Sequence, residues 1–427
     1  MYPHHLFDLY QLLRSQWRPP EEIKRLQNKK LKKLIRHAYE KVPYYRDLFE
    51  SLKIKPEYIQ KVEDLPILPV TSKKELQALP LSKRVAENID LNRCKSYYTS
   101  GTTGIPLNIY YDPRDMTLMN LNWVRAFLAA GMKPWYKMVD FRGMKNLNRR
   151  KAWYEYLWLF RRKEISAWSK PREWIEEIQK WGPQVIVGYV KTLRMLAEAI
   201  QEHQINDIRP KIVFHSSVVL DDFSRQILLS VFRAKRVDIY GSYEGGCIAW
   251  ECEKCSAYHL CSDMVIVEIL KDGKPVTPGE DGEVVITNLH SYAMPFIRYK
   301  QEDVVTLSPK TPVCGRGLPL LDSIQGKTDD FITLKSGRKI SPQPFFYLME
   351  PIPGIKRWRT IQESIDKLRV EIEPSSSFTK DAEKMIDAGL KRVVGDEMEI
   401  EISLVDTIKV DPSTKFRFVY SKVKPKF

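Results

Sequence analysis

The sequence predicts a large α/β domain with an antiparallel subdomain, followed by a small α+β domain. Strands and helices alternate between residues 107 and 240, hairpin patterns follow from 265 to 305, and residues 331–404 show a different order of elements. The length of 427 residues exceeds the roughly 250 to 300 residues at which single cores stop growing. We therefore expect a large domain at residues 1–326 and a small one at 327–427.

The first 80 residues indicate helices. A helix over residues 21–41 ends before Pro43, and its apolar residues recur at helical spacing on one face: Ile23, Leu26, Leu31, Leu34 and Ile35. Ser72 lies three residues before Glu75, which is the spacing of a capping box. We expect a second, shorter helix to begin there.

The middle of the chain alternates in a way that favours a largely parallel sheet. The predicted strands lie at residues 107–111, 137–141, 185–188, 211–215 and 236–240, and the helices at 114–130, 153–160, 191–203 and 222–232. Strands at 265–270 and 283–287, joined through Asp272-Gly273, indicate antiparallel pairing.

In the last part of the chain the predicted elements follow the order strand, helix, two strands, helix and strand. The ranges are 331–334, 343–349, 357–362, 368–372, 379–394 and 398–404. This order suits a ferredoxin-like domain.

Composition limits the class of protein. The chain is 43% hydrophobic, carries a net charge of +15, and has no apolar run near the ~20 residues that span a bilayer. These features predict a globular, cytoplasmic protein without a membrane span. The charge is compatible with nucleic acid, a membrane surface or anionic substrates, but Glu is interleaved with the Lys and Arg, which favours an ordinary basic surface.

A loop of hydroxyl residues and glycines lies between two predicted strands. It contains Ser100, Gly101, Thr102, Thr103 and Gly104. Backbone N–H groups and hydroxyls in such a loop can close over a polyphosphate. The spacing is not that of a P-loop NTPase, and a solvated turn is the alternative.

A second motif follows the strand that ends near Tyr240. The stretch from Gly241 to Gly246 holds Glu244 between glycines, at the sheet edge where α/β proteins bind ligands. Glu244 can hold Mg²⁺ on a phosphate, and Tyr240 can stack on a base. A structural turn explains the motif equally well when it is taken alone.

Five of the six cysteines crowd into one region. Cys252, Cys255, His259 and Cys314 are soft ligands suited to tetrahedral Zn²⁺. We prefer these four to Cys261, which we expect to begin the next strand. Reduced, buried cysteines are the alternative interpretation.

Aromatic residues concentrate at Tyr136 and over 153–160. They offer a surface that can line a pocket, but aromatic residues at helical spacing are more typical of a core.

Three further motifs complete an ordered set: 295–303, which ends in Asp303, then 326–332, and finally Ser413-Thr414-Lys415. With this set the whole chain resembles the adenylate-forming (acyl-CoA synthetase) superfamily, and within it the phenylacetate-CoA ligase-like and CapK-like (capsular polysaccharide) proteins. The runs at 37–46, 63–69 and 187–189 support the narrower resemblance.

The resemblance implies roles for individual residues. Residues 100–104 would form the phosphate loop, and Glu244 would bind Mg²⁺. Asp329 would be the hinge between the two domains. Lys415 would be a catalytic lysine that moves into the site with the small domain. Asp303 would accept the ribose hydroxyls, with Lys327 where relatives have Arg. The nucleotide and acyl pocket would further include Ser216, Ser217, Tyr240, Gly241, Ser242 and Tyr243.

The implied reaction is activation of a carboxylic acid by ATP and Mg²⁺ to an acyl adenylate, followed by transfer to the thiol of coenzyme A or an acyl carrier protein. Some relatives carry structural zinc at the cysteines, and a homodimer is a further expectation. The departures from the family pattern are Ile105, Glu302, Lys327 and Thr414.

Three alternatives stay open. The first is an adenylyltransferase that leaves AMP on a hydroxyl, as with deazaflavin cofactors. The second is acid activation for polysaccharide or cell-envelope modification. The third, suggested by the +15 charge and the Cys-x-x-Cys pair, is a nucleic-acid-binding protein, whose affinity would fall steeply with salt. Our leading hypothesis includes no nucleic-acid partner.

Overall fold

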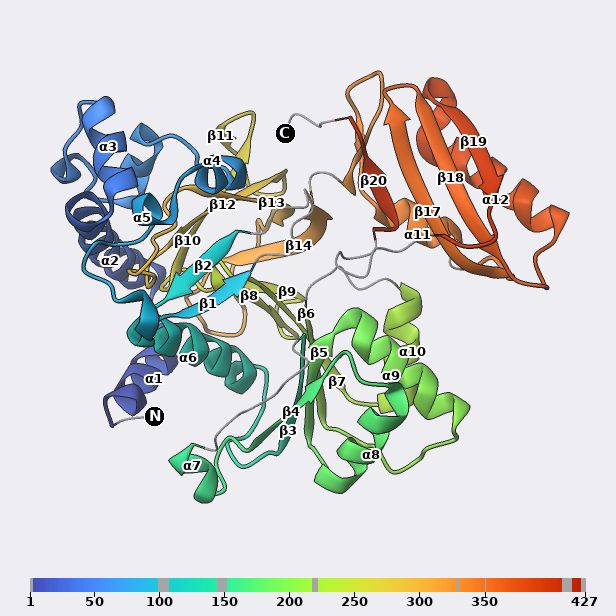
Figure 1. Cartoon of the computed structure of the whole chain (residues 1–427), viewed down its shortest axis with the longest axis horizontal. Helices are drawn as coiled ribbons and strands as arrows, with labels where there is room; N and C mark the ends of the chain where they lie inside the picture. The colour runs from blue at the N-terminus through green and yellow to red at the C-terminus, as the bar shows by residue number, and fades with distance from the viewer. Residues whose placement is uncertain are drawn as a thin grey trace.

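The computed structural model describes residues 3–98, 107–143, 152–216, 222–327, 330–349, 351–408 and 417–423 (Figure 1). A helical segment comes first, with α1 (Pro3–Ser15), α2 (Pro20–Lys41), α3 (Pro43–Ser51), α4 (Lys73–Ala78) and α5 (Leu81–Arg84). The predicted apolar face of α2 is confirmed, since Ile23, Leu31, Leu34 and Ile35 are buried. The capping box is also confirmed, because Glu75 N donates to Ser72 Oγ and Ser72 N donates to Glu75.

A large mixed sheet organises the first three quarters of the chain. Within the described residues it has twelve strands in the order β11-β10-β12-β13-β14-β9-β8-β7-β6-β5-β3-β4. Strands β4, β3, β5, β6 and β7 pair in parallel, and from β7 onward the pairs are antiparallel. A change from parallel to antiparallel pairing is present, but it occurs at β7, earlier than the predicted position near residue 265, because the unpredicted strands β8 and β9 already pair antiparallel.

The parallel strands are β3 (Met138–Arg142), β4 (Arg162–Ser166), β5 (Val185–Tyr189), β6 (Ile212–Ser216) and the first part of β7 (Lys235–Ser242). Helices α8 (Pro171–Trp181), α9 (Val190–Glu202) and α10 (Asp222–Phe232) pack on them and share a core with them. Helix α6 (Pro113–Ala129) precedes β3 and packs in a different core with β8.

The antiparallel strands are β8 (Gly246–Cys252), β9 (Ala257–Leu260), β10 (Val265–Lys271), β11 (Lys274–Pro275), β12 (Asp281–Asn288), β13 (Tyr299–Leu307) and β14 (Leu320–Lys327). A separate hairpin, β1 (Lys95–Tyr98) and β2 (Asn108–Tyr111), stands on either side of residues 99–106.

The C-terminal part has its own core and a four-stranded sheet in the order β19-β18-β17-β20. Strands β17 (Ile355–Ser364) and β18 (Lys367–Pro374) form a hairpin, while β19 (Glu399–Leu404) and β20 (Val419–Ser421) flank it in parallel. Helices α11 (Gln343–Met349) and α12 (Lys380–Val394) join this core, and a small hairpin, β15 (Ile332–Thr333) with β16 (Lys339–Ile340), precedes them. The predicted small α+β domain is confirmed.

The helix predicted over residues 153–160 is shorter than expected. Helix α7 (Trp153–Tyr156) is short, and Tyr156, Leu157 and Trp158 are exposed instead of forming a core. A single helical turn is too short to bury a face of its own. Among the described helices, none combines the length and apolar character needed to cross a membrane.

Candidate active site

The carboxyl end of β7 is where the candidate site begins. Here β7 pairs in parallel with β6 on one side and turns back into antiparallel β8 on the other. A turn at such a switch in a sheet leaves room for a ligand. Ser216 and Tyr189 end the neighbouring strands β6 and β5 as a register pair, so they face the same edge.

Asp303 lies between Tyr240 and Lys327. The Tyr240 hydroxyl donates to Asp303 Oδ2 at 2.7 Å, and Lys327 Nζ lies 3.3 Å from Asp303 Oδ1. Asp303 and Lys327 are register partners on β13 and β14. The structure therefore brings together three of the predicted nucleotide-binding residues from three different strands.

The charges in this group support one another. Burial and the neighbouring Asp303 raise the pKa of Tyr240 well above its usual value, so Tyr240 stays a donor. Desolvation opposes the charge of Lys327, but Asp303, Glu302 and Glu244 outweigh it and raise the pKa of Lys327. Lys327 is thus a cation next to a carboxylate.

Glu244 is a buried carboxyl in the turn between β7 and β8. The Tyr299 hydroxyl donates to Glu244 Oε1 at 3.1 Å, and Asn288 Nδ2 donates to the Glu244 carbonyl at 2.7 Å. Burial raises the pKa of Glu244, and the hydrogen bond from Tyr299 and the charges of Lys327 and Lys73 offset this in part. A carboxylate whose charge is costly when alone gains from a bound cation, and oxygen is the ligand that Mg²⁺ prefers.

The turn around Glu244 needs its glycines. A Cβ on Gly241 would lie 2.5 Å from the carbonyl oxygen of Gly246 and 2.9 Å from Trp123, and a Cβ on Gly245 would lie 2.8 Å from Ile248. Ser242 Oγ accepts from Gly245 N at 2.9 Å and closes the turn. Ser242 therefore shapes the turn from within.

Tyr243 extends the site toward the β1-β2 hairpin. Its ring stacks on Tyr97, with centroids 5.0 Å apart and planes 22° apart, and its carbonyl accepts from the Tyr111 hydroxyl. Residues 99–106, which include the predicted phosphate loop, connect the two strands of this hairpin. Tyr97 and Tyr111 of the hairpin thus contact the turn that carries Glu244.

Glu302, where the resemblance predicts a glycine, has an unusual backbone conformation. Its φ is +61°, a left-handed conformation that glycine adopts without cost and glutamate does not. Lys300 and Val304 pair with Val285 and Glu283 of β12. Residues 301–303 of β13 therefore stand opposite a single residue of β12 and form a bulge. The backbone keeps the shape that a glycine would favour.

Lys73 is a site residue that the sequence reasoning missed. It begins α4, is only 9% exposed, and lies within electrostatic reach of Glu244, Glu302 and Lys327. Backbone hydrogen bonds of Thr71 with Arg298 and Lys300 tie this segment to β13. The capping box fixed where the helix begins, but no spacing in the sequence linked it to residues more than 150 positions away.

Several predicted residues lie outside the described part of the chain: Ser100, Gly101, Thr102, Thr103, Gly104, Ser217, Asp329 and Lys415, together with Ile105 and Thr414. Asp330, next to Asp329, and Arg417, two residues after Lys415, are described and contact each other. Arg417 Nε donates to Asp330 Oδ1 at 2.7 Å, and the two side chains form an ion pair.

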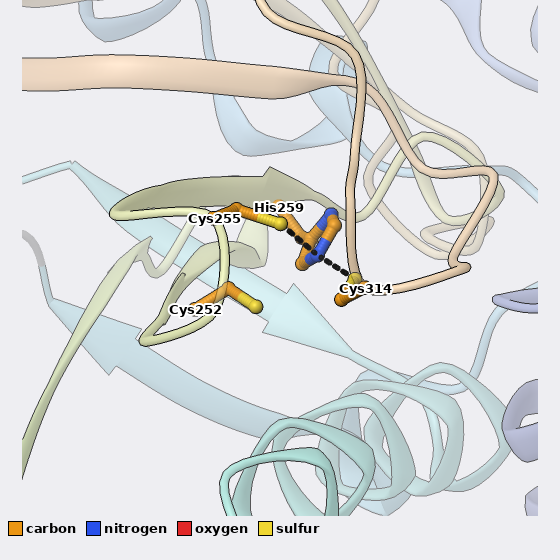
Figure 2. A group of neighbouring side chains, drawn as sticks. All are labelled: Cys252, Cys255, His259 and Cys314. Atoms are coloured by element: carbon orange, nitrogen blue, oxygen red, sulfur yellow. Dashed lines mark hydrogen bonds between the residues drawn. The ribbon is translucent and has the colours of Figure 1, made fainter.

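A second cluster contains the four preferred zinc ligands. The ligand atoms of Cys252, Cys255, His259 and Cys314 all lie within 4.8 Å of one another (Figure 2). His259 Nε2 is 3.1 Å from Cys314 Sγ and 3.9 Å from Cys255 Sγ. Three sulfurs and one imidazole nitrogen form a donor set that suits tetrahedral Zn²⁺.

The surroundings of the cluster favour metal binding. His259 Nδ1 donates to the Leu318 carbonyl at 3.1 Å, which leaves the lone pair on Nε2 facing the sulfurs. Burial lowers the pKa of His259 to about 4, so the ring is neutral. Burial alone would raise the pKa of Cys314, but the backbone and side chain of Arg316 outweigh it and lower that pKa.

Cys261 does not begin a strand as expected. It follows β9, and its thiol lies 3.8 Å from Cys247 Sγ. Cys261 is therefore not part of the four-residue cluster.

Comparisons with known proteins agree with this architecture. Residues 332–422 match the model of the CapK C-terminal domain. The chain is 26% identical over 384 residues to a phenylacetate-coenzyme A ligase of Thermus thermophilus, covering 85% of this chain and 84% of the relative. It is 21% identical over 428 residues to Protein CapK of Staphylococcus aureus, covering 95% and 92%.

Solved structures share the fold. A 2-hydroxyisobutyryl-CoA ligase, in the postadenylation state in complex with R3-HIB-AMP, superposes with a TM-score of 0.78 at 20% identity, covering 96% of this chain and 91% of that chain. On these findings the chain is similar over most of its length to phenylacetate-coenzyme A ligases and to Protein CapK, and it shares the fold of the solved 2-hydroxyisobutyryl-CoA ligase.

Proposed function

We propose that this protein activates a carboxylic acid with ATP and transfers the acyl group to the thiol of coenzyme A. The observation that carries the proposal is the group formed by Tyr240, Asp303, Lys327 and Glu244 at the carboxyl end of β7. The names of the relatives, phenylacetate-coenzyme A ligase among them, support the same chemistry.

The first step joins the acid to AMP. A carboxylate oxygen attacks the α-phosphorus of ATP, the bond to the β-phosphate breaks, and pyrophosphate leaves with the electron pair. Negative charge gathers on the phosphoryl oxygens, so cations that face them stabilise the transition state more than the ground state. Lys73 and Lys327 are the described cations at this place.

Asp303 is proposed to hold the ribose. A carboxylate accepts two hydrogen bonds from adjacent hydroxyls, and Tyr240 and Lys327 fix its orientation from either side. Glu244 is proposed to hold Mg²⁺, which neutralises phosphate charge when bound. Ser216, Gly241 and Tyr243, on the same sheet edge or turn, are proposed to line the pocket for the adenine and the acyl group.

The second step moves the acyl group. The thiol sulfur attacks the carbonyl carbon, the thiol proton passes to solvent, and the bond to AMP breaks. Lys415 is proposed to act in the first step, and rotation of residues 327–427 about Asp329 would open the thiol path for the second. The ion pair between Arg417 and Asp330 supports this proposal, because it joins the flank of each of these two motifs.

Zn²⁺ is proposed as a structural ion at the cluster of Cys252, Cys255, His259 and Cys314. Four protein ligands leave no position for substrate, which is typical of structural sites. A carrier protein as acceptor, a homodimer and a cytoplasmic location stay predictions of the sequence.

Product analysis tests the proposed reaction. The protein is incubated with ATP, Mg²⁺, coenzyme A and a panel of aryl and aliphatic acids, and the products are identified by mass spectrometry. We expect free AMP, pyrophosphate and an acyl-CoA thioester in equal amounts. An AMP group that stays on a hydroxyl of the product would contradict acyl transfer and favour an adenylyltransferase.

A further inference from the structure

An exposed aromatic surface stands at the far end of β3 and β4. It consists of Trp135, Tyr156, Leu157 and Trp158, with side chains between 59% and 69% exposed, and we call these four residues the aromatic knob. Figure 1 shows α7 at the lower left of the molecule, apart from α8, α9 and α10. Large apolar side chains gathered at one exposed place indicate an interaction surface.

Direct contacts hold the residues of the knob in place. The Arg161 guanidinium lies 4.5 Å from the ring centre of Trp158 and donates to the Trp135 carbonyl at 3.4 Å. Phe160 N donates to the Pro134 carbonyl, and the buried Glu155 carboxylate accepts from the backbone of Ala152 at 2.8 Å. The segments that contain Trp135 and Trp158 are therefore tied to each other.

Two residues in this segment, the exposed Trp158 and the partly buried Phe160, have a strained backbone. Trp158 has a φ of +63° and Phe160 a φ of +51°, and a left-handed conformation is unfavourable for bulky residues. Such strain persists only where the surrounding structure enforces it, and it gathers at functional positions.

The knob is far from the candidate active site. Trp135 comes shortly before β3, and Trp158 shortly before β4, so both lie at the amino ends of parallel strands. The candidate site lies at the carboxyl ends, about 15 Å away for five-residue strands at ~3.3 Å per residue. The knob thus does not line the substrate pocket.

Positively charged side chains lie next to the knob. The acidic residue in the same segment, Glu155, is buried and accepts from the backbone of Ala152. Arg162 and Lys163 form ion pairs with Glu164 and Glu177. The cations placed at the knob include Arg161 over Trp158, exposed Lys133, and Lys211, whose Nζ lies 5.1 Å from the Tyr136 ring.

We propose that the aromatic knob docks this protein on an anionic lipid surface. Trp and Tyr side chains place an apolar body and a polar edge at the boundary between acyl chains and headgroups, and Leu enters the acyl region. Lys and Arg next to them are attracted to anionic headgroups. Exposed apolar side chains with neighbouring cations complement a bilayer, which offers acyl chains below its headgroups. A nucleic acid would instead need a row of cations that contact successive phosphates.

Vesicle flotation of the full chain tests the proposal without any need for catalysis. The probes are pure phosphatidylcholine vesicles and vesicles with about 30 mol% phosphatidylglycerol. We expect the anionic vesicles to bind at least ~10-fold more protein at ~0.1 M salt, and binding to weaken as salt rises. Equal recovery with both vesicle types, or no binding to either, overturns the proposal.

Variants locate the binding surface. The double variant Leu157→Ser, Trp158→Ser should reduce vesicle binding by about 10-fold or more, and Arg161→Glu should reduce it as well. Trp168→Ala is the matched control, because Trp168 is also exposed but follows β4 at its opposite end. Unchanged binding by the knob variants overturns the proposal.

Two further outcomes would contradict the proposal. One is a dimer in light scattering that the double variant dissociates, and the other is retention of RNA in place of vesicles. If the double variant does not fold, Trp fluorescence of the wild type with brominated anionic lipid gives the answer instead. Quenching that persists in Trp168→Ala but falls in Trp135→Phe supports docking through the knob, and absence of quenching overturns it.

Discussion

Lys327 Nζ lies 3.3 Å from Oδ1 of Asp303, and the two residues are register partners on β14 and β13. The resemblance seen in the sequence predicts an Arg at the position of Lys327, and Arg binds carboxylates through two parallel hydrogen bonds that lysine cannot make. A single ammonium contact leaves more of the Asp303 carboxylate open to a ligand. The pair therefore places one positive charge next to the carboxylate through a single contact.

Substitution of Lys327 tests this pair. We expect Lys327→Met to raise the KM for ATP by about 10-fold, because Asp303 loses the cation that orients it. Lys327→Arg should keep the KM near that of the wild type, since charge and reach are preserved. Steady-state kinetics decides the matter, and an unchanged KM in Lys327→Met would show that the pair has no part in nucleotide binding.

Removal of the Glu244 charge is expected to lower activity and to raise the stability of the fold. Glu244→Gln should lower kcat by about 100-fold or more through loss of the cation ligand. The same variant should be more stable than the wild type at pH 8 without Mg²⁺, because a buried charge is removed while the hydrogen-bonding shape is kept.

The pH dependence has a definite sign. Burial raises the pKa of Glu244 in the folded state, so this group favours folding below its unfolded pKa and loses that contribution as pH rises through the folded pKa. The stability gain of Glu244→Gln should thus shrink from pH 8 to pH 5 in thermal denaturation. A gain that grows toward acid pH would contradict the assigned shift.

Lys73 is expected to act on the phosphate. Lys73→Met should lower kcat/KM by about 10- to 100-fold, because one of the described cations near Glu244 is lost. Lys74 is its exposed neighbour on the same helix, and Lys74→Met should leave kcat/KM within about twofold of the wild type, as surface charge changes usually do. Equal losses of kcat/KM in Lys73→Met and Lys74→Met would show that Lys73 has no role in the site.

Glu302 offers a test of backbone strain. Its φ of +61° suits glycine, so Glu302→Gly should stabilise the fold by up to about 1 kcal/mol, whereas Glu302→Ala should not. Chemical denaturation of both variants measures the difference. If alanine and glycine are equivalent, the left-handed conformation at this position is not a source of strain.

Metal analysis tests the cysteine cluster. We expect about one equivalent of zinc after dialysis. Cys314→Ser should lose the metal and lower the melting temperature, and Cys261→Ser, outside the cluster, should retain it. Less than about a tenth of an equivalent in the wild type would rule out a structural zinc ion.

The sequence predicted what depends on local pattern. The apolar face of α2, the capping box at Ser72 and the antiparallel pairing of β10 with β12 follow from periodicity and turn residues close along the chain. What it did not predict depends on distant contacts. Lys73 reaches the site because β13 binds the backbone of Thr71. Tyr156 and Trp158 are exposed because a helix of four residues is too short to bury a face of its own.

The most direct test of the proposed activity is exchange of labelled pyrophosphate into ATP, which measures the first step without coenzyme A. We predict exchange that needs Mg²⁺ and one of a panel of carboxylic acids, and that falls by at least about 100-fold in Lys415→Ala. Binding of ATP without exchange in the presence of any acid would contradict acid adenylation by this protein.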